Sequence, residues 1–156
     1  MKKYIIVAPH ADDEVIGCYT LLKSGRVHCV VFPKRESMEE AANSADLFGF
    51  SIKHMDDFPF DGINDKIFVF PDPVYDLHPE HRKLGALGEV LLRAGQEVIF
   101  YTTNMLAPYI FEVIQPESKR QCLNILYPTK KSLWEYDHRY FLFEGYNQWL
   151  INPTNE

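Results

Sequence analysis

The sequence contains little cysteine and no extended apolar segment, and both shortages limit what the chain can be. Only three cysteines occur among 156 residues, and Cys18, Cys29 and Cys122 lack the spacing of a metal site. We therefore expect reduced thiols in the core of a cytoplasmic protein rather than a disulfide framework. No stretch is long enough to cross a membrane, and the apolar run after the charged start is too short for a signal peptide.

Clusters of basic residues are also missing. The chain has 16 Lys and Arg against 22 Asp and Glu, giving a net charge of -6, so we expect neither nucleic acid nor an anionic membrane as a partner. No repeat, low-complexity segment or linker interrupts the sequence. With 46% hydrophobic residues, it predicts one domain, residues 1–156, with a single sizeable core.

Strand and helix patterns alternate along the chain. An apolar, β-branched run at 3–8 predicts a strand, and the helix behind it should end at Gly25. The remaining elements are expected as strands at 27–32 and near 52, a helix over 36–49, a strand at 67–70, a helix over 84–92, strands at 97–102 and 109–114, and helical structure with a polar tail beyond 116. Repeated β–α–β units predict an α/β fold, a Rossmann-like three-layer sandwich with a mostly parallel sheet. Aromatic residues over 134–149 are expected to pack as a C-terminal helix, with one or two rings lining a pocket.

The most informative segment follows the first strand directly. His10, Asp12, Asp13 and Glu14 occupy the connecting loop and the first turn of the next helix. In open α/β sheets, ligands bind outside the carboxyl ends of the strands. Neighbouring carboxylates repel each other unless a cation or a helix N-terminus compensates them. A metal ion is the sharper interpretation, and capping of the helix by Asp12 and Asp13 is the alternative.

A second group of candidate ligands lies far along the chain, at residues 76–82. Pro79 suits the first helical position, which would place His78 at the loop edge and His81 in the first turn. Two histidines and one aspartate would leave a fourth tetrahedral position for water, as in catalytic zinc sites. No glycine-rich fingerprint follows the first strand, so a nucleotide-binding Rossmann protein is not expected.

Both motifs resemble those of the LmbE-like N-acetylglucosaminyl deacetylases, also called the PIG-L family, which are zinc-dependent and hydrolyse N-acyl groups from sugars. The family's Ala-His-Pro-Asp-Asp-Glu corresponds to Pro9-His10-Ala11-Asp12-Asp13-Glu14 here, and its His-Pro-Asp-His-Arg corresponds to His78-Pro79-Glu80-His81-Arg82. Weaker similarity extends over most of the chain at low identity. Three departures stand out: Ala11 replaces a proline, Glu80 replaces an aspartate, and the family's late Ser-Gln pair is not recognisable around residues 127–129.

The resemblance implies a role for each motif residue. His10, Asp13 and His81 would hold Zn²⁺, Asp12 would be the general base, and His78 would stabilise the oxyanion or protonate the leaving amine. We expect Glu14, Glu80 and Arg82 to form hydrogen bonds with the metal-binding side chains or to contact the substrate.

The resemblance also implies a substrate, an N-acetylated sugar conjugate. Other divalent ions suit the same ligands, and a homo-oligomer is left open. Two alternatives remain at this point: a metal-dependent hydrolase of another small amide or modified nucleoside, and a non-catalytic metal-binding α/β module. A pure binding site would need neither Asp12 nor His78, which favours an enzyme.

Overall fold

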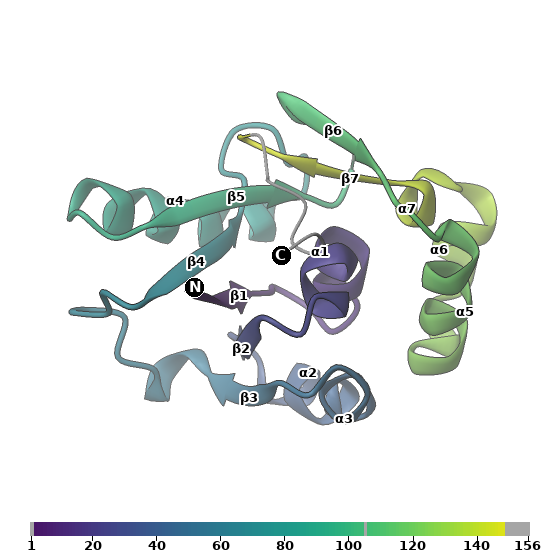
Figure 1. Ribbon diagram of the computed structural model, residues 1–156, viewed down its shortest axis with the longest axis horizontal. Helices are drawn as coiled ribbons and strands as arrows, with labels where there is room; N and C mark the ends of the chain where they lie inside the picture. The colour runs from purple at the N-terminus through teal and green to yellow at the C-terminus, as the bar shows by residue number, and fades with distance from the viewer. Residues whose placement is uncertain (1, 105, 149–156) are drawn as a thin grey trace.

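The computed structural model describes residues 2–104 and 106–148. It is organised around a seven-stranded sheet, whose arrangement can be followed in Figure 1. The strand order is β3-β2-β1-β4-β5-β7-β6. Five strands are parallel: β1 (Lys3–Val7), β2 (Val27–Phe32), β3 (Ser51–His54), β4 (Lys66–Pro71) and β5 (Val98–Thr102). β7 (Phe143–Tyr146) runs antiparallel to β5, and β6 (Tyr109–Glu112) runs antiparallel to β7. The expected mostly parallel α/β fold is confirmed.

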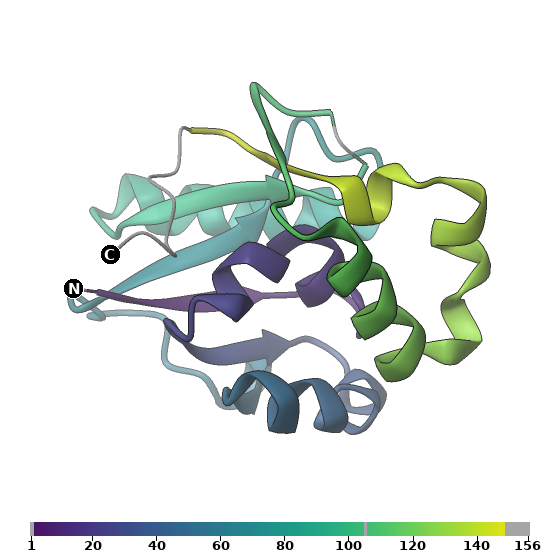
Figure 2. The same ribbon diagram turned by 45° about the vertical axis from the view of Figure 1, so that its right-hand side comes forward.

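Helices cover both faces of this sheet and complete the three layers. One face carries α1 (Asp13–Lys23), α2 (Arg35–Glu40), α3 (Ala42–Phe48) and α5 (Pro116–Leu126). The other carries α4 (Pro79–Arg93) together with the segment 55–63, which contains the 3-10 turn η1 (Met55–Asp57). Beyond α5, the turn η2 (Pro128–Lys130) leads to the short helices α6 (Ser132–Tyr136) and α7 (Arg139–Leu142) at one end of the molecule (Figure 2).

Alternation along the central strands divides the core in two. Ile6 and Val30 pack with α1, whereas Ile5, Val7 and Val31 pack with α4. Successive side chains of a strand point to opposite faces, and both faces are buried here. This burial explains why the strands read as continuous apolar runs rather than as an alternating pattern.

The strand order creates a switch point between β1 and β4. From β1 the chain proceeds outward to β2 and β3, and from β4 it proceeds in the other direction to β5. β1 and β4 are paired neighbours in register, with Ile6 opposite Val69. Their carboxyl ends therefore form the crevice in which open α/β sheets bind ligands. The two sequence motifs follow these two strands.

Two expected helices differ from the structure. The helix expected over 36–49 is interrupted at Ala41 (φ −87°, ψ 0°), which separates α2 from α3. The expectation of a C-terminal helix over the aromatic residues is wrong. The helix α5 ends before Pro128, which has no N–H to continue it. Two short helices follow, and then the strand β7, where Tyr146 pairs with Tyr101. Residues 149–156, with the expected polar tail and Trp149, lie outside the described residues.

The described residues also bear on the membrane and thiol predictions. Within 2–104 and 106–148, no helix is long and apolar enough to cross a membrane. Cys18, Cys29 and Cys122 are free thiols, and the first two are buried.

Candidate metal centre

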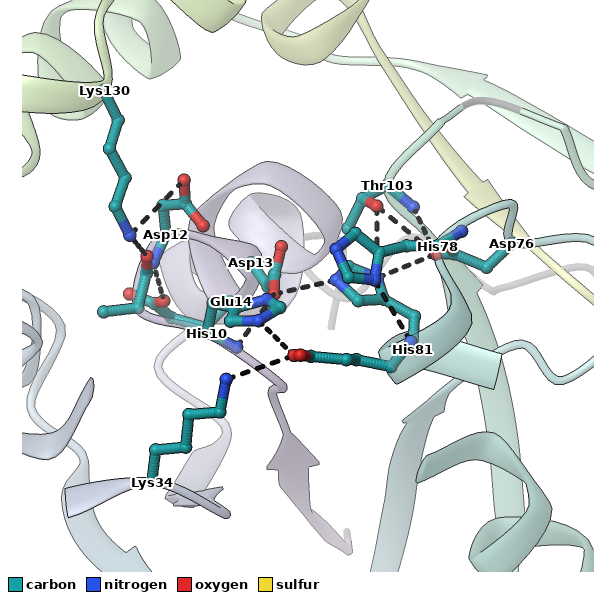
Figure 3. Close-up of polar contacts among 12 residues, drawn as sticks. His10, Asp12, Asp13, Glu14, Lys34, Asp76, His78, His81, Thr103 and Lys130 are labelled. Atoms are coloured by element: carbon teal, nitrogen blue, oxygen red, sulfur yellow. Dashed lines mark hydrogen bonds and ion pairs between the residues drawn. The ribbon is translucent and has the colours of Figure 1, made fainter. Parts of the chain in front are cut away.

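Three side chains from the two motifs converge on one point at the switch crevice (Figure 3). Asp13 Oδ2 lies 3.2 Å from His10 Nδ1 and 3.2 Å from His81 Nε2. Neighbouring ligand atoms on a tetrahedral zinc ion lie roughly 3.3 Å apart, given its bond lengths. Both distances from Asp13 Oδ2 to a histidine nitrogen are therefore close to the spacing of neighbouring zinc ligands.

Each of these histidines contacts a second carboxylate through its outer nitrogen. His10 Nε2 lies 2.6 Å from Glu80 Oε2, and His81 Nδ1 lies 3.1 Å from Asp76 Oδ2. Carboxylates in this position hold the ring proton on the outer nitrogen and leave the lone pair of the inner nitrogen for a metal. Glu80 therefore makes this contact with a side chain one methylene longer than the aspartate that it replaces.

His78 lies beside His10 and His81 but has different hydrogen-bond partners. Its ring stacks on His81 with centroids 4.6 Å apart, and its Nδ1 accepts a hydrogen bond from the Glu80 amide at 3.2 Å. An accepting Nδ1 carries no proton, so the neutral ring has its hydrogen on Nε2. Ligand atoms of His10, His78 and His81 also lie within 4.8 Å of one another, so a three-histidine set is a second geometry for a metal.

Asp76 fixes both histidines of the second motif, a role that the sequence pattern did not predict. It is only 1% exposed, and its Oδ1 accepts the His78 amide at 3.0 Å. Its Oδ2 accepts the Thr103 amide at 3.2 Å and faces His81. The signal in the sequence was an acid two residues before His78, in the loop between β4 and α4.

Opposite charges meet at the convergence point. Burial alone would raise the pKa of Asp13, but hydrogen bonds from His10 and His81 outweigh it and lower that pKa. Burial alone would lower the pKa of His81, yet its contacts with Asp13 and Asp76 raise it to about 10. A protonated ring between two carboxylates thus supplies the positive charge that a metal ion would supply when bound.

Asp12 lies at a strained turn. Its φ of 108° is the one positive value at a non-glycine position among the described residues, a conformation that costs on the order of 1–3 kcal/mol. The capping interpretation is wrong for this residue, because its side chain makes no cap hydrogen bond. Its amide donates instead to Glu14 Oε1 at 2.9 Å. Burial, followed by the charge of Asp13, raises the pKa of Asp12 to about 8.

The turn is also held by residues from far along the chain. Tyr127 donates to Glu14 Oε2 at 2.5 Å. Lys130 Nζ donates to the Ala11 carbonyl and lies 3.8 Å from Asp12 Oδ2. No local sequence pattern marked Tyr127 or Lys130, since their partners lie more than a hundred residues away.

These groups surround a cavity of about 500 Å³. The motif residues form one wall, and the segment 129–140 forms the other. Arg82 is not among the lining residues; its Nε donates to the Pro73 carbonyl at 3.3 Å, outside the cavity. The lining residues are His10, Asp12, Asp13, Ile16, His78, His81, Thr103, Thr129, Lys130, Ser132, Leu133 and Tyr140.

Comparison with known proteins supports the fold. No family model matches the chain, and no curated protein matches its sequence. The structure is similar to the crystal structure of the conserved protein TT1542 from Thermus thermophilus, with a TM-score of 0.64 and 16% identity over 96% of this chain and 95% of that one. At this identity the likeness shows a shared fold and nothing of the chemistry.

Proposed function

We propose that this protein is a metal-dependent hydrolase that removes the N-acyl group from an N-acetylglucosamine-type sugar or conjugate. The observation that carries the proposal is the position of Asp13 Oδ2, 3.2 Å from a nitrogen of both His10 and His81. Two histidines and one carboxylate are the protein ligands of a class of catalytic zinc sites. The same three residues are those that the resemblance to the LmbE-like deacetylases implied.

The ligand set fits zinc better with Asp13 than with His78. His78 already uses its Nδ1 lone pair to accept the Glu80 amide, and its neutral Nε2 carries a proton. Asp13 Oδ2 also accepts the His10 amide at 2.9 Å, but a carboxylate oxygen has a further lone pair, and it lies 3.2 Å from both inner nitrogens. When bound, a zinc ion would polarise the acyl carbonyl and lower the pKa of the attacking water to roughly 7.

Asp12 and His78 flank this point, and we assign the proton transfers to Asp12 and stabilisation of the oxyanion to His78. The charge of a bound zinc ion would favour the ionised form of Asp12. The Asp12 carboxylate, which lines the cavity beside Asp13, would then accept a proton from water as the oxygen attacks the acyl carbon. The Nε2–H of His78 would donate to the oxygen on which negative charge develops. The carbon–nitrogen bond then breaks, and the amine leaves with the proton that Asp12 accepted.

The opposite wall of the cavity favours a small polar substrate. Thr129, Ser132 and Tyr140 are among its lining residues, together with Leu133, and their side chains carry hydroxyl groups that can exchange hydrogen bonds with a sugar. The Tyr140 ring adds an apolar surface of the kind on which sugars pack. This wall supports a sugar over a purely apolar amide.

Metal content measured by mass spectrometry on zinc-supplied protein tests the ligand set. We expect one zinc ion per chain in the wild type and sharply lower occupancy in His10→Ala, Asp13→Asn and His81→Ala. His78→Ala should keep its zinc and lose most N-deacetylation of N-acetylglucosamine conjugates.

Each alternative outcome has a definite meaning. Zinc lost from His78→Ala but retained by Asp13→Asn would show the three-histidine site instead. Zinc bound without turnover of any N-acetylated sugar, but with turnover of another amide, would change the substrate class. No zinc under any loading condition would overturn the proposal.

A further inference from the structure

Residues 127–130 hold the turn that carries Asp12, and we call this segment the clamp. It follows α5 and includes the 3-10 turn η2. It reaches the β1–α1 turn from the opposite side of the cavity, as Figure 3 shows for Lys130. Both of its contacts hold the peptide group between Ala11 and Asp12, one directly and one through Glu14.

The first contact runs through Glu14. The Tyr127 hydroxyl donates to Glu14 Oε2 at 2.5 Å, and Glu14 Oε1 accepts the Asp12 amide at 2.9 Å. Glu14 is fully buried, so this chain of hydrogen bonds is shielded from water. It fixes the amide that precedes the strained φ of Asp12.

The second contact is made by Lys130. Its ammonium donates to the Ala11 carbonyl, the other half of the same peptide unit, and lies 3.8 Å from Asp12 Oδ2 and 3.5 Å from Glu40 Oε2. The Lys130 side chain is 28% exposed and lines the cavity. One peptide group is therefore gripped at its N–H through Glu14 and at its C=O by Lys130.

We propose that Lys130 is a positioning residue for Asp12, holding its carboxylate at the cavity wall where the proposed hydrolysis needs a base. The inference rests on the proposed function for its catalytic consequence, and on the contacts alone for its structural one. A carbonyl bonded to an ammonium is held more strongly than one bonded to a neutral donor. Without that bond, the strained peptide at Asp12 has less to prevent its relaxation.

The neighbouring residue offers a matched control. Lys131 Nζ pairs with Glu135 at 3.2 Å and is not among the residues that line the cavity. Lys130→Met and Lys131→Met remove the same charge from adjacent positions, and only the first should affect Asp12. Lys130→Arg keeps a cation within reach of the Ala11 carbonyl.

Two measurements test the proposal independently. Hydrogen exchange by mass spectrometry on zinc-loaded protein should show exchange of residues 11–14 accelerated by roughly tenfold or more in Lys130→Met, since a charged hydrogen bond is lost. Steady-state kinetics should show kcat lowered by about 10- to 100-fold, the order expected when a reacting group is displaced slightly. KM should stay within about threefold and zinc content should not change. Lys130→Arg should recover most of kcat, and Lys131→Met should match the wild type in every readout.

The results separate the clamp from the proposed reaction. Faster exchange at 11–14 in a protein that hydrolyses no N-acyl sugar would keep the clamp and remove the function. Wild-type exchange and wild-type kcat in Lys130→Met would overturn the inference. Zinc loss in parallel with kcat would also overturn it, because Lys130 would then support the metal site and not Asp12.

Discussion

Asp12 and Asp13 are chain neighbours with opposite electrostatic surroundings. Contacts with His10 and His81 lower the pKa of Asp13 despite its burial, whereas burial and the charge of Asp13 raise the pKa of Asp12 to about 8. Pairs of titratable groups whose environments separate their pKa values often divide catalytic roles. Asp13 is suited to bind a cation, and Asp12 to exchange protons.

Replacing Asp12 with asparagine tests this division at the residue scale. Asn tolerates positive φ, so the turn and the zinc content of Asp12→Asn should be preserved. The kcat for N-deacetylation should fall by about 100-fold or more, because the amide cannot accept the proton. Asp46→Asn, the same charge change on the exposed side of α3, serves as control. Activity of Asp12→Asn equal to that of the control would remove Asp12 from the role of base.

At the scale of elements, two glycines bring α4 close to the sheet. A Cβ at Gly85 would lie 2.3 Å from the Pro71 carbonyl oxygen, and one at Gly88 would lie 2.7 Å from the Phe70 ring. The close approach fixes the first turn of α4, which carries His81 one turn before Gly85. The helix position therefore sets the distance between His81 and Asp13.

Gly85→Ala should push α4 away from β4. The contact is with backbone, which cannot move aside, so we expect a loss of about 1–3 kcal/mol of stability and a Tm lower by roughly 3–10 °C. Zinc affinity should fall with it as His81 retreats from Asp13. Ala86→Ser, at the exposed neighbouring position, should change neither quantity measurably. A Gly85→Ala protein with wild-type Tm and zinc affinity would contradict the link between this packing and the site.

Elements with one dominant local pattern could be predicted from the sequence, and the others could not. The central strands are buried on both faces, so their continuous apolar runs mark them without ambiguity. The strand β7 was not predicted because Phe143, Tyr146 and the aromatic residues before them suit a helix or a strand equally well. Its pairing with β5 and β6 decides the matter, and that pairing is long-range.

At the scale of the whole molecule, the candidate metal centre lies between two parts of the sheet. His10 and Asp13 follow β1, and His81 follows β4. A bound ion would link the β1–α1 segment to the β4–α4 segment, which lead away from each other at the switch point. Both motifs could be recognised in the sequence because each is contiguous. Asp76, Tyr127 and Lys130 were missed because their roles depend on folded contacts.

Metal removal should therefore lower global stability. Zinc at about 100 times its Kd adds about 2.7 kcal/mol to the folded state, or roughly 5–10 °C in Tm for a chain of this size. Thermal unfolding followed by circular dichroism, with and without a chelator, measures the difference. His10→Ala supplies the comparison, since its Tm should not respond to zinc. A wild-type Tm that is insensitive to zinc and chelator would show that no ion ties these segments together.

The wall of the cavity facing the motifs comes from one uninterrupted stretch of chain between β6 and β7. Its two ends are joined, because the Val113 amide donates to the Leu142 carbonyl at 2.9 Å. Everything between them, including the clamp and Tyr140, leaves the sheet and returns to the same place. The same stretch also belongs to the core, because Leu123, Trp134 and Phe141 pack in one cluster with α1. Any change in this wall would therefore also alter the support of α1 and of the turn that carries Asp12.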